Sequence, residues 1–256
     1  MLDMEGSVIL FSLILMRMAG CVFFNPLLGR SNIPIMVKSG FILVLTFLVY
    51  SVSPATTVDV GNLLGYAMLL LKELAVGYIL GAIFNFFIGA LLFAGSVIDF
   101  QMGMSMATVF DPQSNMSVSV TANLLNIMFL ICFWATDAHL VVLQIFLTSA
   151  EIVPYGQIRL GAEVASAGVQ FFAQLMELLF RIAMPMMAIE LLVEVGVGIL
   201  MKTIPQINIF VVNIQMKIMV GLLLLLLLFF SMSDFLAAGT DTLMRGMREM
   251  LALMRG

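Results

Sequence analysis

Charged residues, cysteine and histidine are all scarce in this chain of 256 residues. Only 10% of the residues are Asp, Glu, Lys or Arg, and the formal net charge is −4. Soluble domains carry about 25% charged residues, so a large solvated surface is excluded. The few cations are scattered, which argues against a nucleic-acid partner. With two cysteines and one histidine, the sequence contains neither a disulfide framework nor a zinc-ligand pattern.

Apolar residues, by contrast, make up 62% of the chain, and the mean hydropathy is +1.16. These values are typical of a membrane protein and leave no room for a sizeable soluble domain. We expect an all-α fold with about six long, broken hydrophobic helices, because a backbone exposed to lipid must satisfy its own hydrogen bonds. The apolar segments are 8–28, 35–52, 63–94, 118–147, 165–201 and 209–235.

Three of these segments, 63–94, 118–147 and 165–201, are 30 residues or longer, well beyond the roughly 20 residues that a helix needs to cross a bilayer. Pro185 predicts a kink near Met184, so that the fifth segment consists of two pieces at an angle. Gly77, Gly81, Asn85 and Gly89 form a stripe of small and polar residues, which favours close approach of another helix. Residues 240–256 have the pattern of an amphipathic helix, and we expect this tail to lie on the membrane interface or on a partner.

Isolated ionisable residues interrupt almost every apolar segment. A charge that faces lipid costs a few kcal/mol or more, so such side chains are expected to turn toward protein or water. We predict that they make polar contacts with neighbouring subunits. For Asp137 and His139, a proton relay and a helix break remain as alternatives. The residues in question are Arg17, Lys72, Glu73, Asp137, His139, Arg181, Glu190 and Glu194.

The connection 95–117 contains aspartates but neither lysine nor arginine. It is longer than ordinary connections, which indicates a functional loop or disorder. Its methionines make it too apolar for a solvated linker. We therefore expect a loop that folds back into a protein cavity.

Motifs of enzyme chemistry are missing from the chain. We find no glycine-flanked serine, no paired-aspartate signature, no phosphate-binding glycine loop and no dinucleotide fingerprint. We expect no enzyme activity, no cofactor and no metal.

Several short motifs occur in order along nearly the whole chain. The most specific stretches are 103–112 and 205–210. Shorter ones include Arg17 with Phe24 and Pro26, Glu73 with Gly77 and Gly81, Gly95, Asp99, His139 with Leu140, Pro154 with Tyr155 and Gly156, and Arg181 through Pro185. In this order and spacing, the motifs resemble the FliR family of flagellar biosynthesis proteins.

The resemblance implies a single-copy subunit of the type III protein export gate, in the inner membrane of a bacterium at the flagellar basal body. Its implied partners are FliP-like and FliQ-like subunits, an FlhB-like subunit at the entrance and unfolded export substrates. Residues 1–165 would be a FliP-like part, residues 166–236 a FliQ-like helical hairpin and residues 237–256 the amphipathic tail.

The resemblance also implies roles for two groups of residues. A plug would close the resting pore, and a hairpin turn with the start of the last helix would contact the FlhB-like partner. The plug residues are Gly103, Met104, Ser105, Met106, Ala107, Thr108, Phe110, Asp111 and Pro112, within the loop 95–117. The residues at the turn are Lys202, Pro205, Gln206, Asn208, Phe210 and Lys217.

Two other hypotheses for the function remain open. A self-contained secondary transporter would also carry charges near the membrane midplane, although transporters commonly contain two related halves and we find no such repeat. A structural scaffold that nucleates assembly without lining a path is the second.

Overall fold

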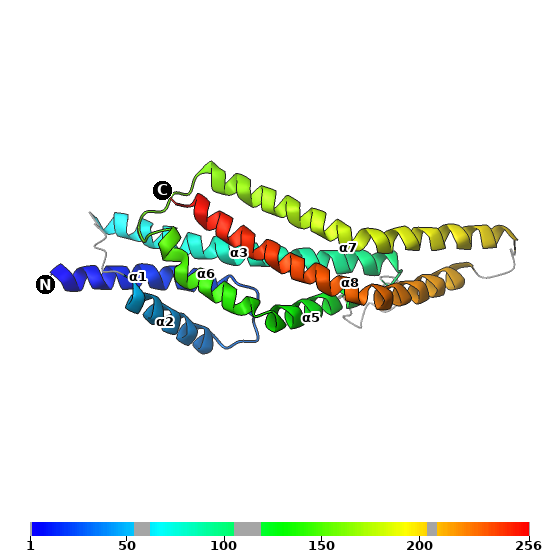
Figure 1. Ribbon diagram of the computed structural model, residues 1–256, viewed down its shortest axis with the longest axis horizontal. Helices are drawn as coiled ribbons and strands as arrows, with labels where there is room; N and C mark the ends of the chain where they lie inside the picture. The colour runs from blue at the N-terminus through cyan, green and yellow to red at the C-terminus, as the bar shows by residue number, and fades with distance from the viewer. Residues whose placement is uncertain (1, 54–61, 105–118, 204–208, 256) are drawn as a thin grey trace. The chain divides into compact units, whose positions relative to one another are not determined.

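The computed structural model consists almost entirely of α-helices (Figure 1). It describes residues 2–53, 62–104, 119–203 and 209–255. Within these ranges the only β-type pairing is an isolated antiparallel bridge between Ile158 and Arg255. The helices are α1 (Leu2–Phe23), α2 (Ile35–Val52), α3 (Leu63–Gln101), α5 (Val120–Ala135), α6 (Ala138–Ile152), α7 (Ala162–Thr203) and α8 (Ile209–Leu253).

Five of the described helices are long and apolar enough to cross a membrane, and the interrupted pair α5 and α6 would make a sixth span. The sequence-based prediction of an all-α membrane protein is therefore confirmed. The bounds of α2 coincide with the predicted segment 35–52.

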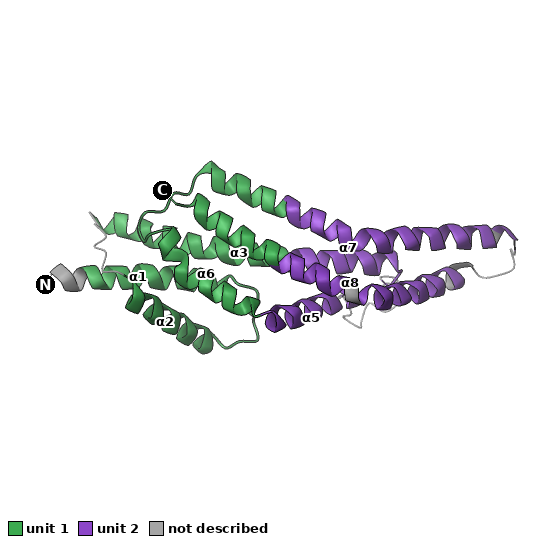
Figure 2. Cartoon of the chain, in the orientation of Figure 1, with its two compact units in different colours: residues 1–87, 137–172, 241–256 green, residues 88–136, 173–240 purple. Residues whose placement is uncertain are grey.

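The chain forms two compact units, each assembled from stretches that are distant in sequence (Figure 2). Unit 1 comprises residues 1–87, 137–172 and 241–256, and unit 2 comprises residues 88–136 and 173–240. These units group residues by contact, whereas the division at residue 165 rests on resemblance to two other families. That division therefore stays a prediction.

Helix α3 continues past the predicted end at residue 94 and finishes at Gln101. The prediction that Gly95 begins a loop is wrong. Gly95 lies inside the helix because α5 passes against it: a Cβ atom at this position would collide with the backbone of Ala122. The glycine permits close packing of two helices in unit 2 and does not end one.

Helix α7 is a single element of 42 residues with Pro185 inside it, so the kink expected there does not divide it into two separate helices. Pro185 has no N–H to donate and its ring crowds the preceding turn, which bends a helix without necessarily breaking it. The axis of α7 changes direction within the part that belongs to unit 2 (Figure 2). The proline therefore leaves the helix intact.

The predicted single segment 118–147 is interrupted between α5 and α6. The Oγ1 hydroxyl of Thr136 donates to the carbonyl of Cys132 over 2.8 Å and completes the last turn of α5. Asp137 then has a φ of 55°, in the left-handed region that side chains disfavour. Of the alternatives for Asp137, a helix break is the one that the structure contains.

The tail does not form a separate element, because α8 runs without interruption to Leu253. Its predicted amphipathic character is present: Leu243, Met247 and Leu251 are completely buried, whereas Arg245 and Arg248 are exposed. The apolar face packs on unit 1 itself, with Gly246 against the ring of Phe171. The expectation that the tail lies on the membrane interface or on a partner is thus wrong for this face.

Candidate functional site

A stripe of buried residues along α1 contains one charged side chain, Arg17. The buried positions Leu10, Leu13, Ile14, Met18 and Cys21 recur every three or four residues, which places them on one face of the helix. Arg17 lies in the middle of this face and is 0% exposed. A charge in such a position must be paired within the protein.

The partner of Arg17 is Glu73 of α3, which is also 0% exposed. The Nε of Arg17 donates to Oε2 of Glu73 over 2.7 Å. The other carboxylate oxygen, Oε1, accepts the backbone N–H of Gly156 over 2.9 Å. Both oxygens of Glu73 are therefore occupied, one by α1 and one by the connection that follows α6.

The guanidinium also contacts the C-terminal end of α6. Its Nη1 donates to the backbone carbonyl of Val153 over 2.9 Å and to the hydroxyl of Ser149 over 3.4 Å. Its Cζ lies 4.3 Å from the ring centroid of Tyr155, a distance at which a cation is attracted to the aromatic face. One arginine thus joins α1, α3 and α6 within unit 1.

Arg17 and Glu73 pair with each other inside unit 1, although Nη2 of Arg17 has no hydrogen-bond partner among the described residues. Contacts of the predicted charged residues with neighbouring subunits stay a prediction. Three helices of unit 1 enclose the pair. Because a buried pair that loses one member leaves an unpaired charge, this cluster fixes how the helices meet.

Tyr155 belongs to this cluster although the sequence analysis gave it no role of its own. Burial raises its pKa above the ordinary value, and this effect outweighs the opposing influence of Arg17. The available signal was the motif Pro154-Tyr155-Gly156, in which Gly156 has a φ of 81°. That conformation is accessible to glycine at low cost, so the motif forms the tight connection that delivers its N–H to Glu73.

Helices α1 and α3 cross at a pair of glycines beside the ion pair. A Cβ on Gly20 would lie 2.7 Å from the carbonyl oxygen of Leu74 and 2.9 Å from the Cα of Gly77. A Cβ on Gly77 would collide with the carbonyl of Arg17. The stripe predicted from Gly77 and Gly81 thus serves the packing of α1, whereas Gly89 has open space around it.

In unit 2, the carboxylate of Asp99 connects the end of α3 to the start of α5. It accepts the hydroxyl of Ser119 over 2.6 Å and the backbone N–H of Thr121 over 3.2 Å. The Thr121 hydroxyl also donates to it. Asp99 therefore holds the end of α3 against the start of α5, a role that sequence reasoning missed because it placed Asp99 in a loop.

The remaining charges of unit 2 lie on α7 and α8. Lys217 pairs with Glu194 across the two helices, with Nζ and Oε2 3.2 Å apart. Glu190, one turn before Glu194, is 0% exposed, and neither of its oxygens has a hydrogen-bond partner among the described residues. Arg181 pairs with Glu177 over 2.8 Å on an exposed face of α7.

The other predicted site residues are dispersed. Lys72 and His139 are half-buried, and Asp137 and Lys202 are exposed. Gly103 and Met104 form the turn after α3, where Gly103 has a φ of 79°. Phe210 lies in the first turn of α8. Residues outside the described ranges are Ser105, Met106, Ala107, Thr108, Phe110, Asp111, Pro112, Pro205, Gln206 and Asn208.

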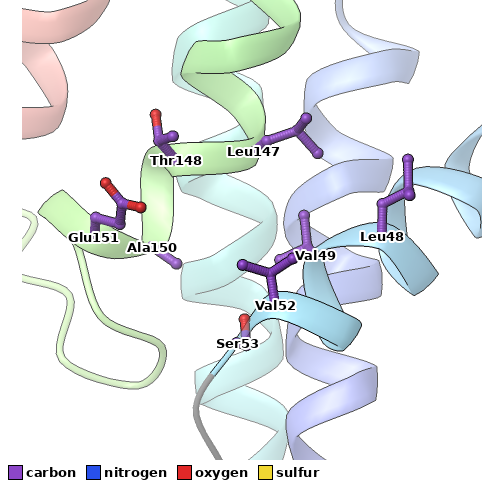
Figure 3. A pocket seen from close by; sticks show the side chains of 8 residues that line it. All are labelled: Leu48, Val49, Val52, Ser53, Leu147, Thr148, Ala150 and Glu151. Atoms are coloured by element: carbon purple, nitrogen blue, oxygen red, sulfur yellow. The ribbon is translucent and has the colours of Figure 1, made fainter.

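A groove in unit 1 lies between the C-terminal ends of α2 and α6 (Figure 3). Its volume is about 400 Å³, and Leu48, Val49, Val52 and Leu147 supply an apolar lining. Glu151 is the titratable residue among those that line it. The groove thus offers apolar contact and no pair of groups for acid–base chemistry.

The fold and the buried polar clusters define an all-α membrane protein in which charges tie helices together. The family model for bacterial export proteins, family 1, matches residues 8–243. The chain belongs to this family.

Curated relatives agree with this assignment and cover most of the chain. It is 31% identical over 222 residues to the flagellar biosynthetic protein FliR of Bacillus subtilis (strain 168), which covers 84% of each chain. It is 26% identical over 215 residues to FliR of Escherichia coli (strain K12), covering 82% of this chain and 80% of that protein. The resemblance to the FliR family is confirmed.

Proposed function

We propose that this chain is a subunit of the flagellar protein export apparatus and that it acts in the membrane without enzymatic chemistry. The observation that carries the proposal is the family match over residues 8–243, together with five helices suited to crossing a membrane. The buried charge pair of Arg17 and Glu73 fits this role, since it holds helices in fixed positions.

Within that apparatus the chain contributes one copy to an export gate and lines the path of unfolded substrates with FliP-like and FliQ-like subunits. Large exposed apolar side chains on α7 and α8 support such an assembly, because they require either lipid or other helices as cover. Examples are Leu192, which is 69% exposed, and Leu226, which is 73% exposed. The gate would reside in the bacterial inner membrane at the flagellar basal body.

The segment after α3 closes the gate at rest. Support comes from Asp99, whose contacts with Ser119 and Thr121 hold the end of α3 against the start of α5. Deletion of residues 103–116 should make the membrane permeable to ions and small solutes. A second variant replaces the same residues with a Gly/Ser stretch of equal length. It should leak as well, because the length of the segment is kept and only the plug side chains are lost. Unchanged permeability in an assembled complex would contradict the plug.

The turn between α7 and α8 faces the cytoplasmic entrance and contacts the FlhB-like partner. Lys202, exposed at the end of α7, supports this placement because a solvated cation suits a position outside the bilayer. A cysteine at position 206 should crosslink to the FlhB-like subunit in intact cells. A cysteine at the exposed position 245 is the negative control and gives the background level of crosslinking. Crosslinking from position 206 that does not exceed this background would refute the contact.

A self-contained secondary transporter is the alternative function. Glu190, a buried carboxylate without a hydrogen-bond partner in the described part of the chain, is the observation that favours it. Purification distinguishes the two: a transporter remains folded and homogeneous alone, whereas a gate subunit requires its partners.

A further inference from the structure

Met102, the residue that follows α3, is seated on α8 at a glycine. Met102 is 0% exposed, and Gly221 of α8 lies against it. A Cβ atom on Gly221 would come within 2.5 Å of Cγ and 2.6 Å of Cε of Met102. The methionine side chain therefore occupies the space that any side chain at position 221 would need.

The same notch contains the carboxylate of Glu190 from α7. Its Oε1 would lie 2.9 Å from that Cβ, so Met102 and Glu190 meet at one point on α8. Lys217, the nearest cation on α8, is already paired with Glu194. Glu190 is left as a buried carboxylate with no hydrogen bond among the described residues.

Two properties of this notch lower the free-energy cost of withdrawing Met102 from it. Methionine is unbranched and adaptable, so it leaves and re-enters a notch more readily than a branched side chain. A buried carboxylate without hydrogen bonds is unfavourable, because it has lost water without gaining a partner. Withdrawal of Met102 opens the space beside Glu190 to water, which offsets part of the lost apolar contact.

We propose that Met102, seated against Gly221 and covering Glu190, is a latch that holds the end of α3 on the α7–α8 hairpin in the resting gate and is released during export. This inference rests on the proposed function. Asp99 lies three residues before Met102 and binds Ser119 and Thr121 at the start of α5. Release of the latch therefore shifts the end of α3 together with the start of α5.

The direct test locks the latch with a disulfide. Met102→Cys and Gly221→Cys are combined in the full chain within its complex, after Cys21 and Cys132 have been replaced by alanine. The Sγ of a cysteine at position 102 takes the place of the methionine Cγ, which lies 2.5 Å from the Cβ position of residue 221, so the two introduced side chains face each other. Export of flagellar substrates is measured under oxidising and reducing conditions, with disulfide formation followed by mass spectrometry.

We expect the oxidised pair to lose export and the reductant to restore it, while the Met102→Cys variant alone exports normally in both conditions. A fully formed disulfide with undiminished export overturns the latch, and so does failure of the two cysteines to bond. The proposed function fails separately: in that case a strain that lacks the chain altogether exports as well as the wild type.

Two further variants keep the test independent of crosslinking. Met102→Ala should raise the ion permeability of cells while the complex still assembles, because the latch is gone and no side chain is overpacked. Gly198→Ala on α7 is the matched control, since a Cβ at this glycine meets nothing within 4 Å. If Met102→Ala is as impermeable as Gly198→Ala, the latch is contradicted.

Discussion

Arg17 and Glu73, separated by 56 positions in the sequence, form an ion pair with Nε and Oε2 2.7 Å apart and both side chains 0% exposed. Around this pair, the backbone of Val153 and Gly156 and the ring of Tyr155 occupy most of the remaining polar sites. The pair thus determines how α1, α3 and α6 meet in unit 1, and it provides the first prediction.

Removing one member of the pair should destabilise the protein strongly. Arg17→Met leaves the Glu73 carboxylate buried with only the Gly156 N–H, and loss of one partner of a buried pair costs about 3–5 kcal/mol. The double variant Arg17→Met with Glu73→Leu removes the uncompensated charge and should recover part of this loss. The thermal unfolding midpoint of the detergent-solubilised complex measures both effects. Equal losses in the single and double variants would show that the charges are not coupled.

The contribution of Tyr155 should come from its ring and not from its hydroxyl. The hydroxyl is buried without a partner among the described residues, so Tyr155→Phe should leave stability unchanged or raise it by up to about 1 kcal/mol. Tyr155→Ala also removes the contact with Arg17 and leaves a cavity, at a cost of about 3 kcal/mol or more. Unfolding midpoints of the two variants provide the comparison, and a Phe variant as unstable as the Ala variant would contradict it.

Two glycines of α3 should respond in opposite ways to the same substitution. A methyl group at Gly77 collides with the backbone of α1, so Gly77→Ala should separate the helices and weaken the adjacent ion pair. Gly89 has open space, and Gly89→Ala should stabilise the helix by about 0.5–1 kcal/mol through its higher helix propensity. The yield of assembled complex tests both. Tolerance of Gly77→Ala at full yield would refute the described crossing.

Asp99 should control the order of the first turn of α5. Asp99→Asn weakens its bonds with Ser119 and Thr121, which should cost about 1–3 kcal/mol locally. Amide hydrogen exchange at residues 119–123 should speed up, and the membrane should leak ions. Asp234→Asn, at an exposed position of α8, is the matched control and should change neither. Unaltered hydrogen exchange in Asp99→Asn would show that the carboxylate does not order the first turn of α5.

The apolar segments could be located from sequence because length and hydropathy are local properties. The helix Ile35–Val52 matches its prediction, whereas the predictions drawn from Gly95 and Pro185 differ from the structure. Gly95 looked like a helix end and is a packing contact with Ala122, and Pro185 looked like a break and lies inside a continuous helix. In both cases a contact or a surrounding helix decided between two outcomes that the residue itself allows.

The site residues show the same limit. The charge of Arg17 indicated that a partner was needed, but nothing in the sequence identified Glu73, because the pairing depends on how α1 crosses α3. Likewise, Met102 and Gly221 are ordinary residues for a membrane helix, and only their meeting point with Glu190 makes them notable. Patterns along the chain predict which groups require partners, whereas tertiary structure determines the partners.

The most direct test of the account is native mass spectrometry of the complex purified through this chain in mild detergent. We predict one copy of the chain together with several copies of FliP-like and FliQ-like subunits, and an unstable product when the chain is expressed alone. A stable, monodisperse protein that carries a small solute across vesicles without partners would contradict the central claim.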